Sequence, residues 1–375
     1  MIKPTHLRQA FRIFSNSIKR RLKGTKKYEG DAEEICGQII EKCWNGRYYL
    51  TSAGHFCEFY CRDFGWSAES LIKLGHEDRV EKTLDYALDV FSKNGGIATT
   101  ITPWDKPIDI YHYAPDSLAF LLRTISLLKD KSIAEKYKDF LNSEISKFFE
   151  TVIDKETGLV RTDKQFSSMK DYSRRQSSCY DNVMVWVVKD SLEKIGVLRN
   201  PLKNYDLEKL LIKNFWVGTY FKDDLSDKFY VAGDANVYPF WTGMVRDKKM
   251  IKSAVREIRE NKLDDPLPLS YTNPDIKTKM LWHEKFVIPG YEQSTVWTHM
   301  GPLFIEVVAK VSEQKAKEYL MHYKNTIEKY RNYLEIFDRN LQPYKTPFYY
   351  SDESMLWAAN YLALSKRLLK TKTLK

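Results

Sequence analysis

The sequence predicts an all-α protein in which twelve helices form six hairpins closed into a ring, an (α/α)6 toroid. Apolar residues recur at steps of three and four along most of the 375-residue chain, as at Leu118, Leu122 and Ile125. The chain has 16 glycines and 13 prolines, fewer than an all-β protein with many tight turns would need. A regular alternation in the lengths of the connections between helices is the third observation.

The periodicity places each helix in turn. Asp31, Asp116 and Asp352 stand at or near three of the expected starts, where an aspartate can accept hydrogen bonds from free N–H groups. The predicted helices cover residues 31–44, 64–74, 78–94, 115–129, 132–151, 179–195, 204–215, 237–245, 248–261, 295–309, 313–331 and 352–370.

The connections between these helices alternate strictly in length. Six long connections of 19 to 33 residues are separated by five short ones of 2 to 8 residues. Helices joined in this way run back and forth between two ends, so all the long loops gather at one end. This arrangement favours a closed ring of hairpins, and the alternative is a two-domain helical array whose loop lengths vary by chance.

The net charge of +10 comes from the two ends of the chain. Residues 1–30 contain nine Lys and Arg and one Glu, and residues 366–375 contain five Lys and Arg and no acid, so the residues between them carry a net −3. The body therefore lacks the basic surface of a nucleic-acid-binding protein, and no nucleic-acid partner is expected. We expect a basic amphipathic helix or tail over residues 1–28 and a single toroid domain over residues 29–375.

Residues 4–22 carry an apolar stripe with basic residues around it. The stripe consists of Leu7, Phe11, Phe14, Ile18 and Leu22, and the basic residues are Arg8, Arg12, Lys19 and Arg20. We expect this segment to pack against the outside of the toroid or to form a loose tail. Weak contact with an anionic membrane surface is the alternative.

The cysteine and hydropathy patterns of the chain indicate where in the cell the protein is expected. No stretch approaches 18 consecutive apolar residues, and the first residues lack the pattern of a secretory signal. The five cysteines show neither zinc-site spacing nor a disulfide framework. We therefore expect a cytoplasmic protein with no metal and no cofactor, and the oligomeric state is not indicated.

The six long loops combine aromatic and acidic residues. They contain 140 residues, yet hold 25 of the 52 aromatic residues of the chain. Aromatic rings that stack on the C–H faces of a pyranose, beside side chains that bind its hydroxyl groups, are what a sugar-binding cleft requires. Acids recur where a long loop meets the next helix, and each of them is alternatively a helix cap. These junctions are Arg62-Asp63, Asp116, Asp181, Asp234 and Asp352-Glu353.

Four segments resemble the six-hairpin glycosidases, which include glucoamylases, the amylo-1,6-glucosidase part of glycogen-debranching enzymes and processing glucosidases. The segment YCRDFGWSAESL resembles their Arg-Asp motif, and YHYAPDSLAFLL resembles their Tyr–Asp sequence before the fourth helix. The segments YEQSTVWTHMGPLF and LEIFDRNLQPYKTPFYYSDESMLW resemble the loops before the tenth and the last helix. The resemblance spans residues 45–370 and implies a glycoside hydrolase that acts on a neutral, α-glucosidic oligosaccharide.

The resemblance also implies roles for individual residues. Glu335, on the loop before the last helix, takes the position of the catalytic base. The acid is expected on loop 152–178, where Asp171 is the first choice, Asp181 the second, and Glu292 on a later loop the third. The implied mechanism is inversion with two carboxyl groups. The expected sugar-binding residues are Arg62, Asp63, Trp66, Trp104, Asp116, Asp181, Glu292, Trp297 and His299.

Two other functions stay open at this stage. A sugar epimerase or isomerase on the same toroid would use a pair of histidines, and the chain has His55, His112, His283 and His299 in or near the long loops. A carbohydrate-binding or membrane-surface protein without catalysis is the other alternative. A polysaccharide lyase is disfavoured because its acidic substrate would need a cationic cleft, whereas the body of this chain is mildly acidic.

Overall fold

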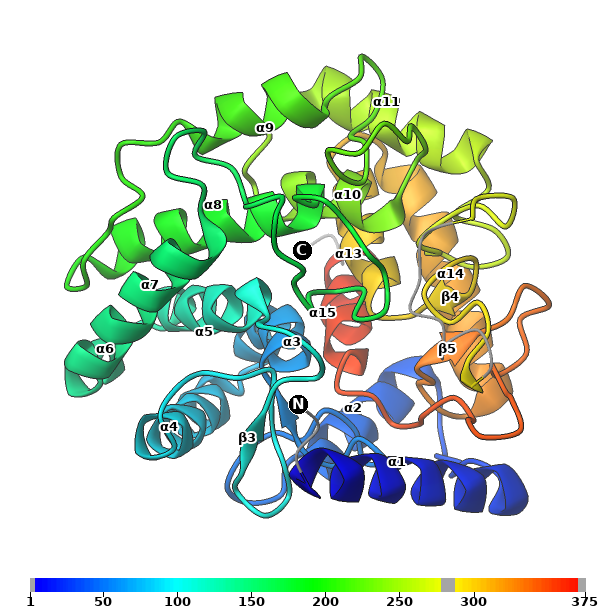
Figure 1. Ribbon diagram of the computed structural model, residues 1–375. Helices are drawn as coiled ribbons and strands as arrows, with labels where there is room; N and C mark the ends of the chain where they lie inside the picture. The colour runs from blue at the N-terminus through cyan, green and yellow to red at the C-terminus, as the bar shows by residue number, and fades with distance from the viewer. Residues whose placement is uncertain (1–3, 278–286, 370–375) are drawn as a thin grey trace, which may run out of the picture.

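The computed structural model describes residues 4–277 and 287–369, and their helices form two concentric rings (Figure 1). The inner ring consists of α3 (Cys61–Lys73), α5 (Pro115–Leu127), α8 (Cys179–Ile195), α10 (Gly233–Trp241), α13 (Met300–Ala309) and α15 (Ala358–Leu368). The outer ring consists of α2 (Ala32–Cys43), α4 (Glu77–Lys93), α6 (Ser132–Lys136) with α7 (Lys138–Val152), α9 (Leu207–Phe215), α11 (Lys248–Glu260) and α14 (Glu313–Tyr330).

Contacts between neighbouring helices close the inner ring. Each of α3, α5, α8, α10 and α13 packs against the next inner helix, and α15 packs against both α13 and α3. The outer helices pack against this ring, and α2 joins α14 to α15. The predicted all-α fold of six helical hairpins, an (α/α)6 toroid, is therefore confirmed.

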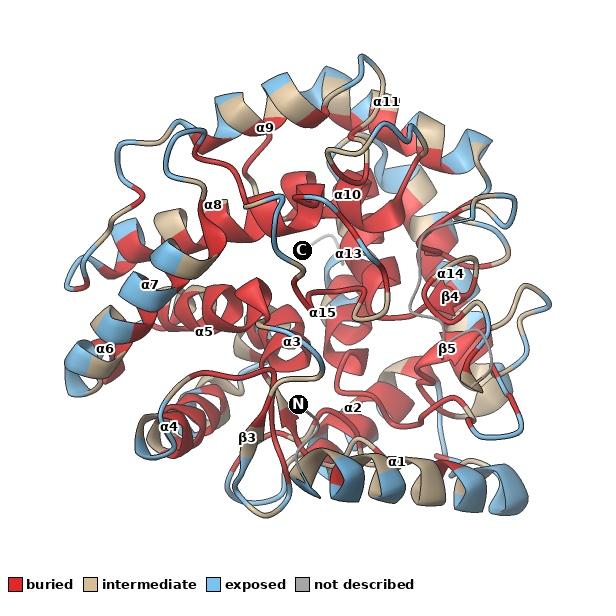
Figure 2. Cartoon of the chain, viewed as in Figure 1, coloured by how far each residue is buried: buried red, intermediate tan, exposed pale blue. Residues whose placement is uncertain are grey.

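Burial separates the two rings (Figure 2). All nine residues of α10 are buried, because it is covered by α8, α11 and α13. The outer helix α11 instead buries Ile251, Ala254, Val255 and Ile258, which recur at steps of three and four along one face. Because the first turn of every inner helix is buried, any polar group at these loop ends needs a partner inside the protein.

Two small antiparallel sheets tie the long loops together. Strands β1 (Phe59–Tyr60), β2 (Thr100–Ile101) and β3 (Pro107–Ile108) pair in that order, and β4 (Val296–Trp297) pairs with β5 (Ile336–Phe337). In the second sheet Val296 lies opposite Phe337 and Trp297 opposite Ile336. The loops before α13 and before α15 therefore form one unit.

Three of the predicted helices begin at least three residues later than the sequence suggested, among them α9, which was predicted from residue 204 and is helical from Leu207. The segment predicted as 295–309 is helical only from Met300, since Val296 and Trp297 belong to β4. The segment predicted as 352–370 becomes helical at Ala358, because the residues before it form hydrogen bonds with other loops. Two inner helices begin earlier than predicted, α3 at Cys61 and α10 at Gly233, and the predicted helix 132–151 is divided at Tyr137.

Helix α1 (Pro4–Lys23) packs on the side of the ring, across the long loops before α3 and α15 (Figure 1). The backbone N–H of Tyr350 donates to Ser17 Oγ at 2.7 Å, and Arg20 pairs with Glu353 at 2.6 Å. The segment thus packs against the toroid rather than forming a loose tail. None of the described helices is long and apolar enough to cross a membrane.

Gly65 allows α3 and α5 to approach closely, and this contact gives a test of the packing. A Cβ atom at Gly65 would overlap the side chain of Phe120 on α5. We expect Gly65→Ala to lower the free energy of unfolding by about 1–3 kcal/mol, as overpacked cores do. Urea unfolding followed by circular dichroism measures this change.

Gly37→Ala on α2 is the matched control. A Cβ atom at Gly37 would have no neighbour within 4 Å, so alanine there should raise stability by up to about 1 kcal/mol through helix propensity. Equal effects of the two substitutions would contradict the close contact between α3 and α5.

Candidate active site

A cavity of about 530 Å³ lies at the loop end of the ring. Its walls come from α1, from the long loops and from the start of α3. This volume is in the range of small-molecule sites. Eight of the eleven residues expected to act on or bind the sugar line it, namely Arg62, Asp63, Trp66, Asp171, Glu292, Trp297, His299 and Glu335.

Glu335 is a buried carboxylate held by three donors. Its Oε1 accepts from the Tyr291 hydroxyl at 2.6 Å, and its Oε2 accepts from the Tyr349 hydroxyl at 2.6 Å and the backbone N–H of Asp352 at 2.9 Å. Burial raises the pKa of Glu335 to about 7, and the charge of Asp352 adds to the rise, while the hydrogen bonds oppose it. A carboxylate poised near neutral pH is suited to accept a proton from water.

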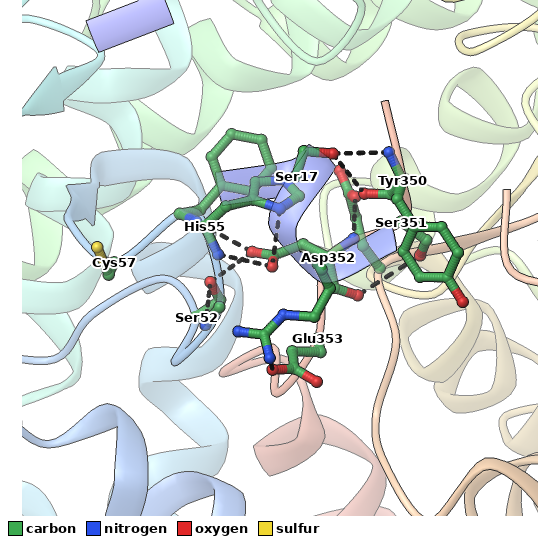
Figure 3. A network of polar contacts seen from close by, with 12 residues as sticks. Ser17, Ser52, His55, Cys57, Tyr350, Ser351, Asp352 and Glu353 are labelled. Atoms are coloured by element: carbon green, nitrogen blue, oxygen red, sulfur yellow. Dashed lines mark hydrogen bonds and ion pairs between the residues drawn. The ribbon is translucent and has the colours of Figure 1, made fainter. Parts of the chain in front are cut away.

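The position of Glu335 depends on Asp352, which connects two loops (Figure 3). The Asp352 carboxylate accepts from Ser52 Oγ at 2.5 Å and from the backbone N–H groups of His55 and Phe56 at 2.8 and 3.0 Å. His55 Nδ1 also lies 3.1 Å from Asp352 Oδ1, and burial lowers the pKa of this histidine. Loop 45–60 thus supports the backbone that donates to Glu335.

Asp171 faces the same cavity from the loop before α8. Its carboxylate lies 3.3 and 3.4 Å from the guanidinium of Arg62, in the first turn of α3. Arg62 also donates to Asp116 at 2.8 Å and to the Ser167 carbonyl at 3.1 Å. The Arg62 guanidinium therefore joins α3, α5 and the Asp171 loop.

Buried charges on both sides of Asp171 fix its backbone. Lys170 Nζ lies 2.9 Å from Asp223 and 3.0 Å from Asp234, and all three side chains are buried. On the other side, the backbone N–H of Tyr172 donates to Glu292 at 3.0 Å. These contacts hold the residue between them at the wall of the cavity.

Asp63 and Glu292 provide two further carboxyl groups. Asp63 Oδ1 accepts from Trp357 Nε1 at 3.0 Å, and burial raises the pKa of Asp63 to about 7 although Arg62 opposes the rise. Glu292 is 2% exposed and accepts from the Tyr172 N–H and, at 3.5 Å, from Ser173 Oγ. The described lining thus contains four carboxyl groups, from four segments of the chain, and the guanidinium of Arg62.

Aromatic rings form one wall of the cavity. The rings of Trp66 and His299 stack with centroids 4.2 Å apart and planes at 6°, and Trp357 packs edge-on against His299. His299 Nε2 lies 3.0 Å from the Tyr271 hydroxyl. Burial, with a contribution from Arg62, holds the pKa of His299 well below 6.5, so this ring is neutral. Such a surface can stack against a sugar.

Three residues expected to bind sugar lie outside the lining. Trp104 packs against Arg8 of α1, whose guanidinium carbon lies 4.0 Å from the ring centroid. Asp116 is fully buried beneath Arg62 and also accepts from the Tyr180 hydroxyl. Asp181 accepts from Ser178 at the N-terminus of α8. In the structure Asp116 thus belongs to an ion pair and Asp181 to the hydrogen bonds at a helix start, and a role of these three residues in sugar binding stays a prediction.

Two of the histidines that an epimerase could use, His112 and His299, line the cavity, and His299 is stacked on Trp66. His55 is buried against Asp352 and lies outside the described lining. His283 lies outside the described residues. Within residues 4–277 and 287–369, no three His, Cys, Asp or Glu side chains are grouped as metal ligands.

Sequence reasoning missed the contribution of α1 and of the tyrosines to the cavity. Residues from α1 that line it are His6, Leu7, Gln9, Ala10, Ile13 and Phe14. The aromatic-rich loops pointed to Tyr291 and Tyr349 only as a group. Nothing in the local sequence around these tyrosines indicates that both donate to Glu335.

Comparisons with known proteins agree with the fold. No protein-family model and no curated protein sequence matches the chain. A solved structure of a glycosidase variant in complex with glucose superposes with a TM-score of 0.63 at 11% identity, covering 98% of this chain and 99% of that chain. A rhamnosidase from Klebsiella oxytoca with rhamnose bound has a TM-score of 0.62 at 11% identity, covering 92% of this chain and 65% of that chain.

The fold of a third solved structure is similar to that of this chain to a comparable degree. The GH63 mannosylglycerate hydrolase from Thermus thermophilus, in complex with Tris and D-glycerate, has a TM-score of 0.59 at 13% identity. The match covers 89% of this chain and 100% of that chain. The chain therefore shares the helical-toroid fold of the six-hairpin glycosidases that its sequence motifs resemble.

The raised pKa of Glu335 makes stability depend on pH. The folded protein holds this proton up to a pKa of about 7, whereas an ordinary glutamate loses it near 4.5. The stabilising contribution is therefore fully present below about pH 4.5 and is lost as the pH rises through about 7. As the pH rises from about 4.5 to above 7, the free energy of unfolding of Glu335→Gln should therefore increase by up to about 3 kcal/mol relative to that of the wild type.

Denaturant unfolding at a series of pH values measures this difference. Glu81→Gln, at an exposed position of α4, is the control and should follow the wild type at every pH. A constant difference between Glu335→Gln and wild type from acid to neutral pH would contradict the protonated, buried state of Glu335.

Proposed function

We propose that the protein is an inverting glycoside hydrolase that acts on a neutral oligosaccharide with an α-glucosidic linkage. The observation that carries this proposal is that Glu335 and Asp171, from loops far apart in the sequence, line one cavity with an aromatic wall. Paired carboxyl groups are the catalytic groups of most glycosidases. The likeness in fold to several glycosidases supports the same reaction class.

In the proposed reaction Glu335 acts as the general base. It accepts a proton from a water molecule, whose oxygen attacks the anomeric carbon as the bond to the leaving oxygen breaks. Asp171 gives a proton to that oxygen, so the products are a free sugar of inverted configuration and an alcohol. The hydroxyl groups of Tyr291 and Tyr349 orient Glu335 through their hydrogen bonds.

Asp171 must carry a proton to act as the acid. Its carboxylate lies in an ion pair with Arg62, so we propose that substrate binding weakens this contact and frees the carboxyl group for the leaving oxygen. Glu292, which lines the same cavity beside Tyr172, is the alternative acid. Asp181 is less suitable, since it lies outside the described lining and accepts from Ser178.

The charges of the cavity favour a neutral substrate. Its described lining has four carboxyl groups, and its guanidinium, that of Arg62, already contacts Asp116 and Asp171. An anionic sugar would meet mostly like charge there. Asp63 and the stacked rings of Trp66 and His299 are suited to bind the hydroxyl groups and the apolar face of a terminal glucose.

Removing the base should abolish hydrolysis without unfolding the protein. We expect Glu335→Gln to lower kcat on α-linked gluco-oligosaccharides by about 10²–10⁴-fold. The wild type should release the inverted anomer, which proton NMR detects before mutarotation. Glu81→Gln should keep wild-type kcat, and full activity of Glu335→Gln would exclude Glu335 as the base.

Substrates that differ in their leaving group separate the two candidate acids. A glucosyl fluoride needs little protonation of its leaving group, so loss of the acid should slow its cleavage far less than that of an oligosaccharide. We expect Asp171→Asn to lose about 10²-fold or more on oligosaccharides yet to cleave the fluoride at near wild-type rates. The same pattern for Glu292→Gln, with Asp171→Asn unaffected, would assign the acid to Glu292 instead.

A further inference from the structure

We infer that α1 is a docking helix for an anionic membrane surface. The side of α1 that faces the solvent carries an apolar stripe. Leu7, Phe11, Ile18 and Leu22 are 62%, 77%, 42% and 81% exposed. Because they follow one another at steps of four and seven, they lie along a single face of the helix. This exposed stripe consists of large apolar side chains on the surface of the folded protein.

The opposite side of α1 explains why the stripe stays exposed. The helix is attached through polar residues, since Arg12 pairs with Glu58 and donates to the His55 carbonyl at 2.9 Å. Further along, Ser17 bonds the backbone of Tyr350, and Arg20 pairs with Glu353 (Figure 3). Of the apolar residues of α1, Phe14 packs against the hydrophobic core. The four exposed ones do not contribute to the attachment, and turning them inward would break these polar contacts.

Other exposed apolar residues gather near α1. Of the ten large apolar side chains that are exposed in the described part of the chain, four are on α1. Two more, Tyr111 and Phe348, lie on segments tied to α1 by the contact of His6 with the Asp109 carbonyl and by the bond from Arg21 to the Thr346 carbonyl. Clustering of this kind marks an interaction surface rather than scattered surface residues.

The charge around the stripe identifies the partner. Arg8, Lys19, Arg21 and Lys23 are exposed on α1, and Glu29 is the sole acid among residues 1–30. An apolar stripe bordered by cations is the pattern of a helix that lies in the interface of an anionic bilayer. A second copy of this chain would instead bring the same positive charges together.

Docking through α1 would also orient the cavity. Leu7 belongs both to the exposed stripe and to the lining of the cavity, so the mouth of the cavity lies beside the proposed membrane surface. The cytoplasmic location expected from the sequence fits this proposal, because the cytoplasmic leaflet is the one that carries anionic lipids.

Vesicle co-sedimentation of the full chain tests the inference. We expect binding to phosphatidylcholine vesicles that contain about one third phosphatidylglycerol, little binding to pure phosphatidylcholine, and weaker binding at high salt. The triple variant Phe11→Ser, Ile18→Ser and Leu22→Ser should bind at least about tenfold more weakly. These three residues lie outside the described cavity lining.

A matched triple variant controls for the loss of exposed apolar surface. Val217→Ser, Phe229→Ser and Met321→Ser change three exposed apolar residues away from α1 and should leave binding unchanged. Circular dichroism checks that both variants keep the helical fold. Equal binding by the two triple variants, or no binding by the wild type, would overturn the inference.

Self-association is the remaining outcome to distinguish. If sedimentation velocity shows a wild-type dimer that the α1 variant dissociates, while vesicles bind neither protein, the stripe is an interface between copies and the membrane inference is wrong. All these readouts are independent of hydrolysis, so failure of the proposed enzymatic function would not affect them.

Discussion

Carboxylates buried at the loop end of the inner ring must be paired with cations or with hydrogen-bond donors inside the protein, and the arrangement of the cavity depends on this requirement. Asp116 at the start of α5 is paired with Arg62 of α3, and Asp234 at the start of α10 is paired with Lys170 and Arg175. Removing one partner of such a pair typically costs about 3–5 kcal/mol, because the other charge is left buried. Lys170 and Arg175 come from the loop that carries Asp171. The ion pairs that neutralise Asp234 therefore also fix the position of the proposed acid.

The opposite wall is held by hydrogen bonds around a different carboxylate. Asp352 accepts from Ser52 and from two backbone N–H groups of loop 45–60, and its own N–H donates to Glu335. The strand pair β4–β5 places Ile336 beside Trp297, so the backbone next to Glu335 is fixed from a third loop. The two proposed catalytic groups are therefore held by different contacts. Ion pairs fix the loop of Asp171, hydrogen bonds fix Glu335, and the two networks meet at the cavity.

The sequence predicted those features that repeat locally, and missed those that depend on a distant partner. Helical periodicity and alternating loop lengths are visible within short windows, and acids at helix starts indicated the end at which the cavity lies. The late starts of α13 and α15 were not visible, because Val296 becomes a strand only by pairing with Phe337, some 40 residues later. Asp116 and Asp181 were expected to bind sugar, because an acid in a buried ion pair and an acid that accepts from the N-cap serine of its helix have the same local sequence as a site carboxylate.

Helix α1 is the clearest case of a feature that depends on distant partners. Its apolar stripe suggested a packing face, and Phe14 of that stripe does pack against the core. The other contacts that hold the helix come from Arg12, Ser17 and Arg20, whose partners lie in two distant loops. A basic side chain can replace apolar packing here because Glu58 and Glu353 are available at the loop end, and burial raises the pKa of Glu58 to about 8 although Arg12 opposes the rise. One face of α1 thus completes the wall of the cavity, and this attachment is what leaves its apolar face directed to the solvent.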